Sequence, residues 1–220
     1  MSQDSVFSDV DGERITTKPY WRSDDVPRHV ARRMLVIPGV RYSCDRPLLN
    51  WISAIGHQHG WWVQQAQWDL SAQTNQDAVI ARALELLDQD APDADQTMVV
   101  AKSMGSRAAS AASANGWCGI WLTPLLDVEE VRAALVEYHG PALIAGGGAD
   151  PHWTAGHGAP RARIGRKGDC DGELDELGVS WVDVADANHS LEVPGDWRAS
   201  LAVQRSLFEL ADGFIDLLSR

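Results

Sequence analysis

The most constraining feature of the sequence is the stretch Thr97 to Gly105, in which a short apolar run leads directly into a serine. Such a run, followed by the alanine-rich segment Arg107 to Ala114, predicts a buried parallel strand and a helix packed close against its sheet. The chain must reverse sharply between the two, and this turn projects the Ser103 hydroxyl out of the fold. The turn needs small residues two positions before and after the serine, which Ala101 and Gly105 provide. Ser103 is therefore a candidate nucleophile.

Composition restricts the class of protein and of partner. The chain has 220 residues and a net charge of -12, which indicates one domain and disfavours nucleic acid or an anionic membrane as a partner. Three cysteines, Cys44, Cys118 and Cys170, are odd in number and lack metal-ligand spacing, so we expect reduced thiols. No apolar run resembles a signal peptide or approaches the roughly 20 residues of a membrane span. These features favour a cytoplasmic protein and leave its oligomeric state open.

The order of the expected elements predicts the fold class. Residues 1–33 are polar and weakly patterned, and are compatible with a loose tail or with one or two edge strands. Residues 34–220 alternate strands with helices, which predicts a single α/β domain with a mostly parallel sheet and helices on both faces. Strands are expected at 34–37, 61–66, 97–102, 119–122, 142–145 and 181–184. Helices are expected near 48–55, 80–87, 107–114, 128–138 and 207–217, and Asp45 is expected to cap the first of them.

Polar residues follow several of these strands. In parallel α/β sheets, function gathers in the loops beyond the carboxyl ends of the strands. The strand at 34–37 delivers the segment from Pro38 to Arg41, and the strands at 97–102, 142–145 and 181–184 deliver Ser103, Asp150 and His189. A serine, an acid and a histidine thus occur in that order, each in a loop at the same expected edge of the sheet.

This arrangement resembles the α/β-hydrolase superfamily. The turn at Ser103 is similar to the nucleophile elbow of that superfamily, G-x-S-x-G, with Ala101 in place of the first glycine. The chain order of serine, acid and histidine is also the same. Three segments, 38–43, 102–106 and 189–192, look like those of small, lidless bacterial members that are distantly similar to dienelactone hydrolases. The resemblance covers about residues 34–220 and implies an α/β-hydrolase fold without a cap domain. Dienelactone hydrolases use cysteine where this chain has Ser103, so their substrate is not implied.

The resemblance implies a role for each of these residues. Ser103 would be the nucleophile, His189 the general base and acid, and Asp150 the residue that orients the imidazole. Asp127, after the preceding strand, is the alternative acid. The oxyanion would bind the main-chain N–H groups of Met104 and Val40, with Arg41 as the rival of Val40.

The expected cleft is open, because only residues 127–140 separate two strands where many α/β-hydrolases insert a lid. Substrate-binding residues are expected to be Arg41, Tyr42, Leu125 and Trp153, with Leu126 beside them. Residues 151–172 predict a long surface loop that could act as a flap, and Lys102 is expected to face solvent.

No metal or cofactor is expected. The histidines His57, His59, His152 and His157 lie in separate segments without carboxylates at fixed spacing. The glycines at 146–148 lack the spacing of a phosphate-binding loop and indicate a flexible turn.

Two functions of different classes follow from the sequence. The first is a serine esterase, or related acyl hydrolase, that acts on a small-molecule ester through Ser103, His189 and Asp150. The second is a non-catalytic protein that uses the same cleft to bind a ligand or partner, for which Ala101 and Lys102 at the elbow are the supporting features. Substitution of Ser103 by alanine separates the two, because only the first function requires the hydroxyl.

Overall fold

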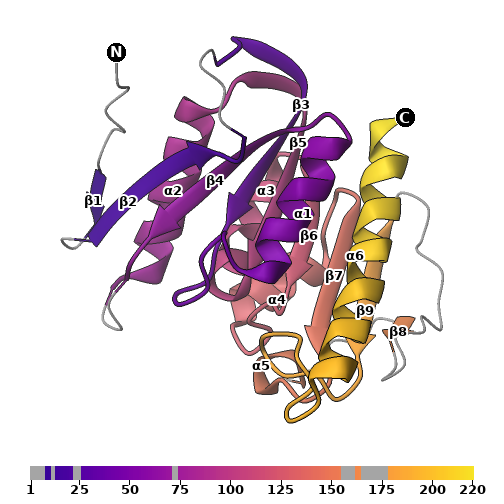
Figure 1. The fold of residues 1–220 in the computed structure, drawn as a ribbon. Helices are drawn as coiled ribbons and strands as arrows, with labels where there is room; N and C mark the ends of the chain where they lie inside the picture. The colour runs from indigo at the N-terminus through magenta and orange to yellow at the C-terminus, as the bar shows by residue number, and fades with distance from the viewer. Residues whose placement is uncertain (1–7, 11–12, 22–25, 71–73, 155–161, 165–177) are drawn as a thin grey trace.

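The computed structural model of the chain describes residues 8–10, 13–21, 26–70, 74–154, 162–164 and 178–220. In this part of the chain the strands form one sheet in the order β1-β2-β4-β3-β5-β6-β7-β9-β8 (Figure 1). The pairs β1–β2 and β2–β4 are antiparallel, and all other neighbouring pairs are parallel. The strands are β1 (Ser8–Val10), β2 (Glu13–Pro19), β3 (His29–Ile37), β4 (Trp62–Trp68), β5 (Asp93–Lys102), β6 (Cys118–Leu122), β7 (Ala142–Gly147), β8 (Ala162–Ile164) and β9 (Val179–Val184).

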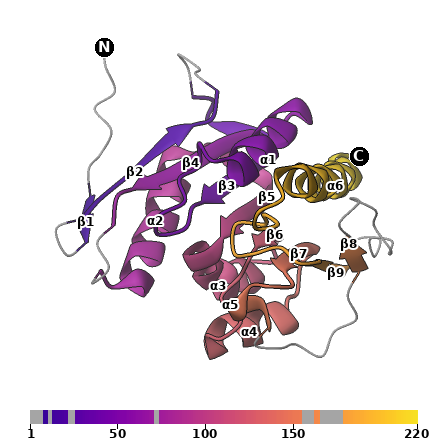
Figure 2. The ribbon, with the colours of Figure 1, turned by 60° about the horizontal axis from the view of Figure 1, so that its bottom comes forward.

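Helices cover both faces of the sheet. Two of them, α1 and α6, lie on one face, whereas α2, α3 and α4 lie on the other (Figures 1 and 2). Their apolar stripes and the continuous apolar runs of the central strands explain this three-layer arrangement, because a parallel sheet must be buried on both faces. The helical segments are α1 (Pro47–Gln58), α2 (Gln76–Asp90), the 3-10 helix η1 (Ser103–Ala108), α3 (Ala109–Ala114), α4 (Glu129–Val136), α5 (Pro151–Thr154) and α6 (Trp197–Ser219).

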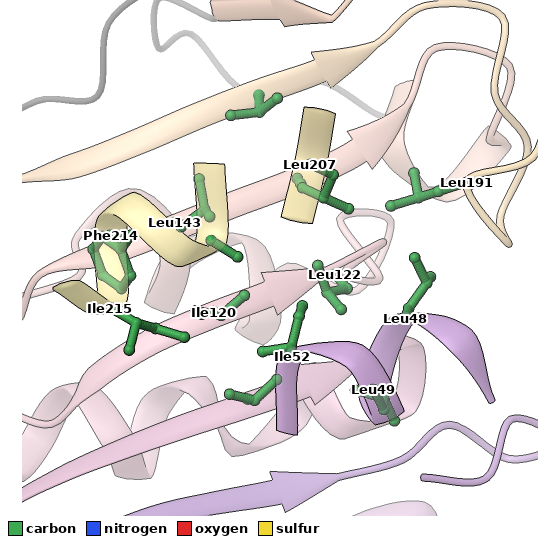
Figure 3. Close-up of a cluster of buried hydrophobic side chains, with 14 of the residues drawn as sticks. Leu48, Leu49, Ile52, Ile120, Leu122, Leu143, Leu191, Leu207, Phe214 and Ile215 are labelled. Carbon is green, nitrogen blue, oxygen red and sulfur yellow. The ribbon is translucent and has the colours of Figure 1, made fainter. Parts of the chain in front are cut away.

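Successive strand residues point to two separate cores. Met34 and Val36 of β3 face the core under α1 and α6, and Leu35 and Ile37 face the core under α2 and α3. Figure 3 shows how the first core is filled by side chains of both helices and of β6 and β7. The figure labels Leu48, Leu49 and Ile52 of α1, Ile120 and Leu122 of β6, Leu143 of β7, Leu191, and Leu207, Phe214 and Ile215 of α6.

The predicted fold class is confirmed. The sheet is mostly parallel, helices lie on both of its faces, and the connection from β6 to β7 holds α4 without a cap domain. Among the described residues, no helix is both long and apolar enough to span a membrane.

Several local expectations differ from the structure. The residue directly before α1 is Arg46, not Asp45, and its side chain makes no capping hydrogen bond. The Asp45 carboxylate accepts a hydrogen bond from Lys18 Nζ at 3.0 Å. Strand β3 begins at His29, five residues before the expected boundary at residue 34. Of the two readings left open for residues 1–33, edge strands are present, because β1 and β2 form an antiparallel edge beside β4. The expected loop 151–172 begins with α5 and contains β8, and its other residues, including His157 and Cys170, lie outside the described residues.

Candidate active site

The turn at Ser103 is tight enough to require small neighbours. Ser103 follows β5 with a φ of 52°, in the left-handed region that residues other than glycine rarely adopt. A Cβ atom at Gly105 would lie 2.7 Å from the main-chain oxygen of Ile37 and 3.2 Å from Cβ of Ala101. Glycine after the serine and alanine before it therefore let η1 approach the neighbouring strand, which is the space that the elbow requires.

A chain of hydrogen bonds joins three residues at this edge of the sheet. Nε2 of His189 lies 2.8 Å from Oγ of Ser103, and Nδ1 lies 2.7 Å from Oδ2 of Asp150. An ionised carboxylate only accepts hydrogen bonds, so Nδ1 of His189 carries the proton and Nε2 is left as an acceptor for the Ser103 hydroxyl. Asp150 is fully buried, whereas the His189 side chain is 34% exposed. The arrangement can thus take a proton from Ser103 while the imidazole stays oriented.

The loops after β7 and β9 pack closely against each other. A Cβ atom at Gly147 would lie 2.2 Å from the main-chain oxygen of Ala187, so only glycine allows this approach. The N–H of Ala149 donates to that same oxygen at 2.9 Å, and the N–H of His152 donates to Oδ1 of Asp150 at 3.1 Å. These contacts fix the acid beside the loop that carries the histidine.

Asp127 contacts a different histidine. Its Oδ2 lies 2.9 Å from Nδ1 of His152, and the His152 ring lies edge-on to the His189 ring at a centroid distance of 5.1 Å. The structure therefore places Asp150, and not Asp127, against the histidine that contacts Ser103. In the sequence, His152 stands out only as a candidate metal ligand, and no sequence signal indicates its pairing with Asp127.

The loop after β3 passes over the serine. A Cβ atom at Gly39 would lie 3.3 Å from Cβ of Ser103, and the Gly39 oxygen accepts a hydrogen bond from Nε1 of Trp68 at 3.0 Å. The next residue, Val40, is half-buried, and Met104 after the serine is 1% exposed. Both candidate oxyanion donors thus lie in segments packed around Ser103.

The expected substrate-binding residues lie in different environments. Arg41 is exposed, and Tyr42 and Leu125 are half-buried, with the hydroxyl of Tyr42 accepting a hydrogen bond from the N–H of Leu48 at 3.1 Å. Trp153 is fully buried, and its Nε1 donates to Oδ1 of Asp183 at 2.8 Å. Trp153 therefore packs in the core and does not line a cleft.

The expectation that Leu126 lies beside the substrate-binding residues is also corrected. Leu126 is fully buried in the core under α2 and α3, although it follows the half-buried Leu125 directly. Trp153 reaches that core because Gly146 of β7 leaves room for it: a Cβ atom there would lie 2.1 Å from the indole.

Lys102 does not face solvent, which corrects that expectation. Its side chain is 2% exposed, and its ammonium group donates hydrogen bonds to Oγ1 of Thr123 and to the main-chain oxygen of His189. Burial lowers the pKa of Lys102 to about 8, and the carboxylate of Asp150 opposes this shift. The two-residue period of a strand could have indicated the burial, because Lys102 continues the face of Met98 and Val100.

No group of three or more histidine, cysteine, aspartate or glutamate side chains is arranged to hold a metal ion within the described residues. Two of the histidines that the sequence singled out have other contacts: the ring of His57 stacks on Trp21, and Nε2 of His59 lies 2.9 Å from Oδ1 of Asp212.

Comparisons with known proteins give a match at the level of structure. No family model and no curated protein matches the sequence. A putative α/β hydrolase from Agrobacterium tumefaciens has a TM-score of 0.61 at 12% identity, covering 96% of this chain and 94% of that one. Est1E from Butyrivibrio proteoclasticus with bound ferulic acid also has a TM-score of 0.61 at 12% identity, over 98% of this chain and 100% of that one.

A dienelactone hydrolase from Anabaena variabilis is similar over 94% of both chains, with a TM-score of 0.56 and 17% identity. Identities this low show the shared fold alone, and the matches extend over nearly the full length of each chain. The protein has the α/β-hydrolase fold, with esterases and a dienelactone hydrolase among its structural neighbours.

Proposed function

We propose that the protein is a serine hydrolase that cleaves carboxylic esters, or related acyl compounds, through an acyl-enzyme. The observation that supports this most is the continuous contact from Asp150 through His189 to Ser103, at 2.7 Å and 2.8 Å. The left-handed conformation of Ser103 adds to it, because strain of this kind is kept where the surrounding structure demands one orientation of the hydroxyl.

In the first half of the reaction, Oγ of Ser103 attacks the ester carbonyl carbon and its proton passes to Nε2 of His189. The buried carboxylate of Asp150 stabilises the imidazolium that forms. Collapse of the tetrahedral intermediate breaks the bond to the alcohol oxygen, which takes the proton from Nε2. The acyl group stays on Ser103.

The negative oxygen of the intermediate requires donors that are already in place. We assign this role to the main-chain N–H groups of Met104 and Val40. Gly39 supports the assignment, because its lack of a side chain lets the β3 loop approach Ser103 closely.

Water completes the cycle. His189 takes a proton from a water molecule as its oxygen attacks the acyl carbon, and the second intermediate collapses to release the carboxylic acid and to return the proton to Ser103. The enzyme ends in its starting state, and no step needs a cofactor.

The substrate class follows from the short β6–β7 connection. Because only α4 lies there, an ester presented on a larger molecule can approach as readily as a small free ester. The exposed Arg41 and the half-buried Leu125 would contact the substrate. Est1E binds ferulic acid, so a feruloyl ester is a rational member of a substrate panel.

We also propose a cytoplasmic location. Cys44 and Cys118 are free and buried, as expected of thiols kept in a reducing compartment. Fractionation of cells that make the protein tests this, and recovery outside the cytoplasmic fraction would contradict it.

Hydrolysis of a panel of acyl esters of increasing chain length tests the proposed reaction. We expect Ser103→Ala to abolish turnover while the protein stays folded. Ser110→Ala is the matched control, because Ser110 is exposed on α3 and should keep full activity. Turnover by folded Ser103→Ala would overturn the proposal, and a folded wild-type protein without activity would favour the non-catalytic ligand-binding function.

A further inference from the structure

Lys102 connects three loops around the candidate site. It is the last residue of β5, and its ammonium nitrogen lies 3.1 Å from Oγ1 of Thr123 and 3.0 Å from the main-chain oxygen of His189. The same nitrogen lies over the ring of Tyr42, 4.6 Å from the ring centroid. One cation thus contacts the loops that follow β3, β6 and β9.

An ammonium group is costly in this position. A side chain that is 2% exposed has lost nearly all of its hydration, and the remaining contacts must replace it. The lowered pKa of Lys102 reflects this burial. A methionine of similar length would fill the same space without the cost, so the packing of the core does not account for a lysine here.

Thr123 supports the same conclusion. It is fully buried with a φ of 44°, which is a strained conformation for a β-branched residue. Its N–H donates to the main-chain oxygen of Ala145 at 2.7 Å, and its hydroxyl accepts a hydrogen bond from Lys102. The strain is located where the hydroxyl meets the ammonium group.

We propose that Lys102 is a positioning residue, which fixes the main chain of His189 against the strand that carries Ser103. The inference rests on the proposed function. Asp150 holds the imidazole through its side chain and Lys102 holds the same residue through its main-chain oxygen, so two constraints act on the position of Nε2. The contact with Tyr42 extends this support to the loop that follows β3.

Lys102→Met tests the role, with Lys18→Met as the matched control. Lys18 forms an ion pair with Asp45 and is 39% exposed, so its replacement removes a lysine without touching the site. We expect Lys102→Met to lower kcat by about 10- to 100-fold with KM within about threefold, because a misplaced group slows the reaction more than it weakens binding. Thermal unfolding of both variants checks that they are folded.

Proton NMR gives a readout that does not depend on turnover. The low-field resonance of the His189 Nδ1 proton, assigned by its loss in His189→Gln, should shift or broaden in Lys102→Met and stay unchanged in Lys18→Met. A folded Lys102→Met protein with wild-type kcat and an unchanged resonance would overturn the inference. If Lys102→Met does not fold, Lys102→Leu, which also removes the N–H donor to the His189 oxygen, is judged by the same criteria.

The two proposals fail in different ways. If the wild-type protein hydrolyses no ester, the proposed function fails, and the resonance alone decides whether Lys102 positions His189. If the wild type is active and Lys102→Met equals it in kcat and in the resonance, the positioning role is wrong and the proposed function stands.

Discussion

Two aspartate–histidine pairs lie side by side at the carboxyl edge of the sheet. The Nδ1 to Oδ2 distance is 2.7 Å between His189 and Asp150 and 2.9 Å between His152 and Asp127. The centroids of the two imidazole rings are 5.1 Å apart. Their surroundings differ: Asp150 is fully buried, whereas the Asp127 side chain is 47% exposed. The contact distance alone does not distinguish the pairs.

Burial and a third partner do distinguish them. Solvent screens the Asp127–His152 contact, so it orients its histidine weakly. The buried carboxylate of Asp150 acts in a medium of lower dielectric, and its histidine also contacts Ser103. An aspartate–histidine contact is therefore expected to support catalysis only where the carboxylate is buried and the histidine also contacts a nucleophile.

The largest expected difference is between the two histidines. His189→Ala should lower kcat/KM by at least about 10³-fold, because no base remains to accept the Ser103 proton. His152→Ala should change it by less than about fivefold, since the N–H that His152 donates to Asp150 belongs to the main chain and survives the substitution. Steady-state hydrolysis of one ester by both variants measures the difference, and equal losses would show that the comparison is mistaken.

The next largest expected difference is in kcat, between substitutions of the two aspartates. Asp150→Asn should lower kcat by about 10³-fold, because an amide opposite Nδ1 favours the wrong tautomer of His189. Asp127→Asn should stay within about threefold of the wild type, because its carboxylate is solvated. Measured side by side on the same substrate, a larger loss for Asp127→Asn would reverse the assignment of the acid.

A third prediction concerns the cation behind the buried pair. The folded-state pKa of Lys102, about 8, lies below its ordinary value, so between about pH 8 and about pH 10 Lys102 binds more protons in the unfolded chain than in the folded one. The free energy of unfolding of the wild type, relative to Lys102→Met, should therefore rise with pH over this window, by about 3 kcal/mol in full.

Urea unfolding of both proteins at about pH 7 and about pH 10 measures this change. The other groups that face Lys102, which are Asp150, His189 and Tyr42, are present in both proteins and largely cancel in the difference. A relative stability that is constant or falls with pH would contradict the buried-cation description.

The smallest expected effect is on stability at the exposed pair. Asp127→Asn should change the free energy of unfolding by less than about 0.5 kcal/mol, as for other screened surface ion pairs. A loss of several kcal/mol in urea unfolding would mean that this pair is not the weak member of the comparison.

Much of the fold was predictable because buried parallel strands are short apolar runs. Residues such as Met34 to Ile37 have few alternatives to the interior, and the helices between the strands show apolar stripes. The Ser103 turn was predictable for a steric reason, since Ala101 and Gly105 are the small residues that it needs.

Other features depend on contacts between distant residues. Trp153 is buried because Gly146 leaves space for its indole, and nothing next to Trp153 in the sequence indicates this. Asp127 and Asp150 both follow strands, and only the positions of the loops decide which one meets His189. Lys102 was expected at the surface because a lone lysine rarely lies inside, and its partners Thr123 and His189 come from other strands.

The central claim is that the buried pair activates Ser103. Labelling of the native protein with a fluorophosphonate probe, followed by peptide mass mapping, tests it most directly. We expect the label on Ser103 in the wild type and in Asp127→Asn, and its loss in His189→Ala and in heat-denatured protein. A folded wild-type protein that stays unlabelled, or that carries the label on another residue, would contradict the account.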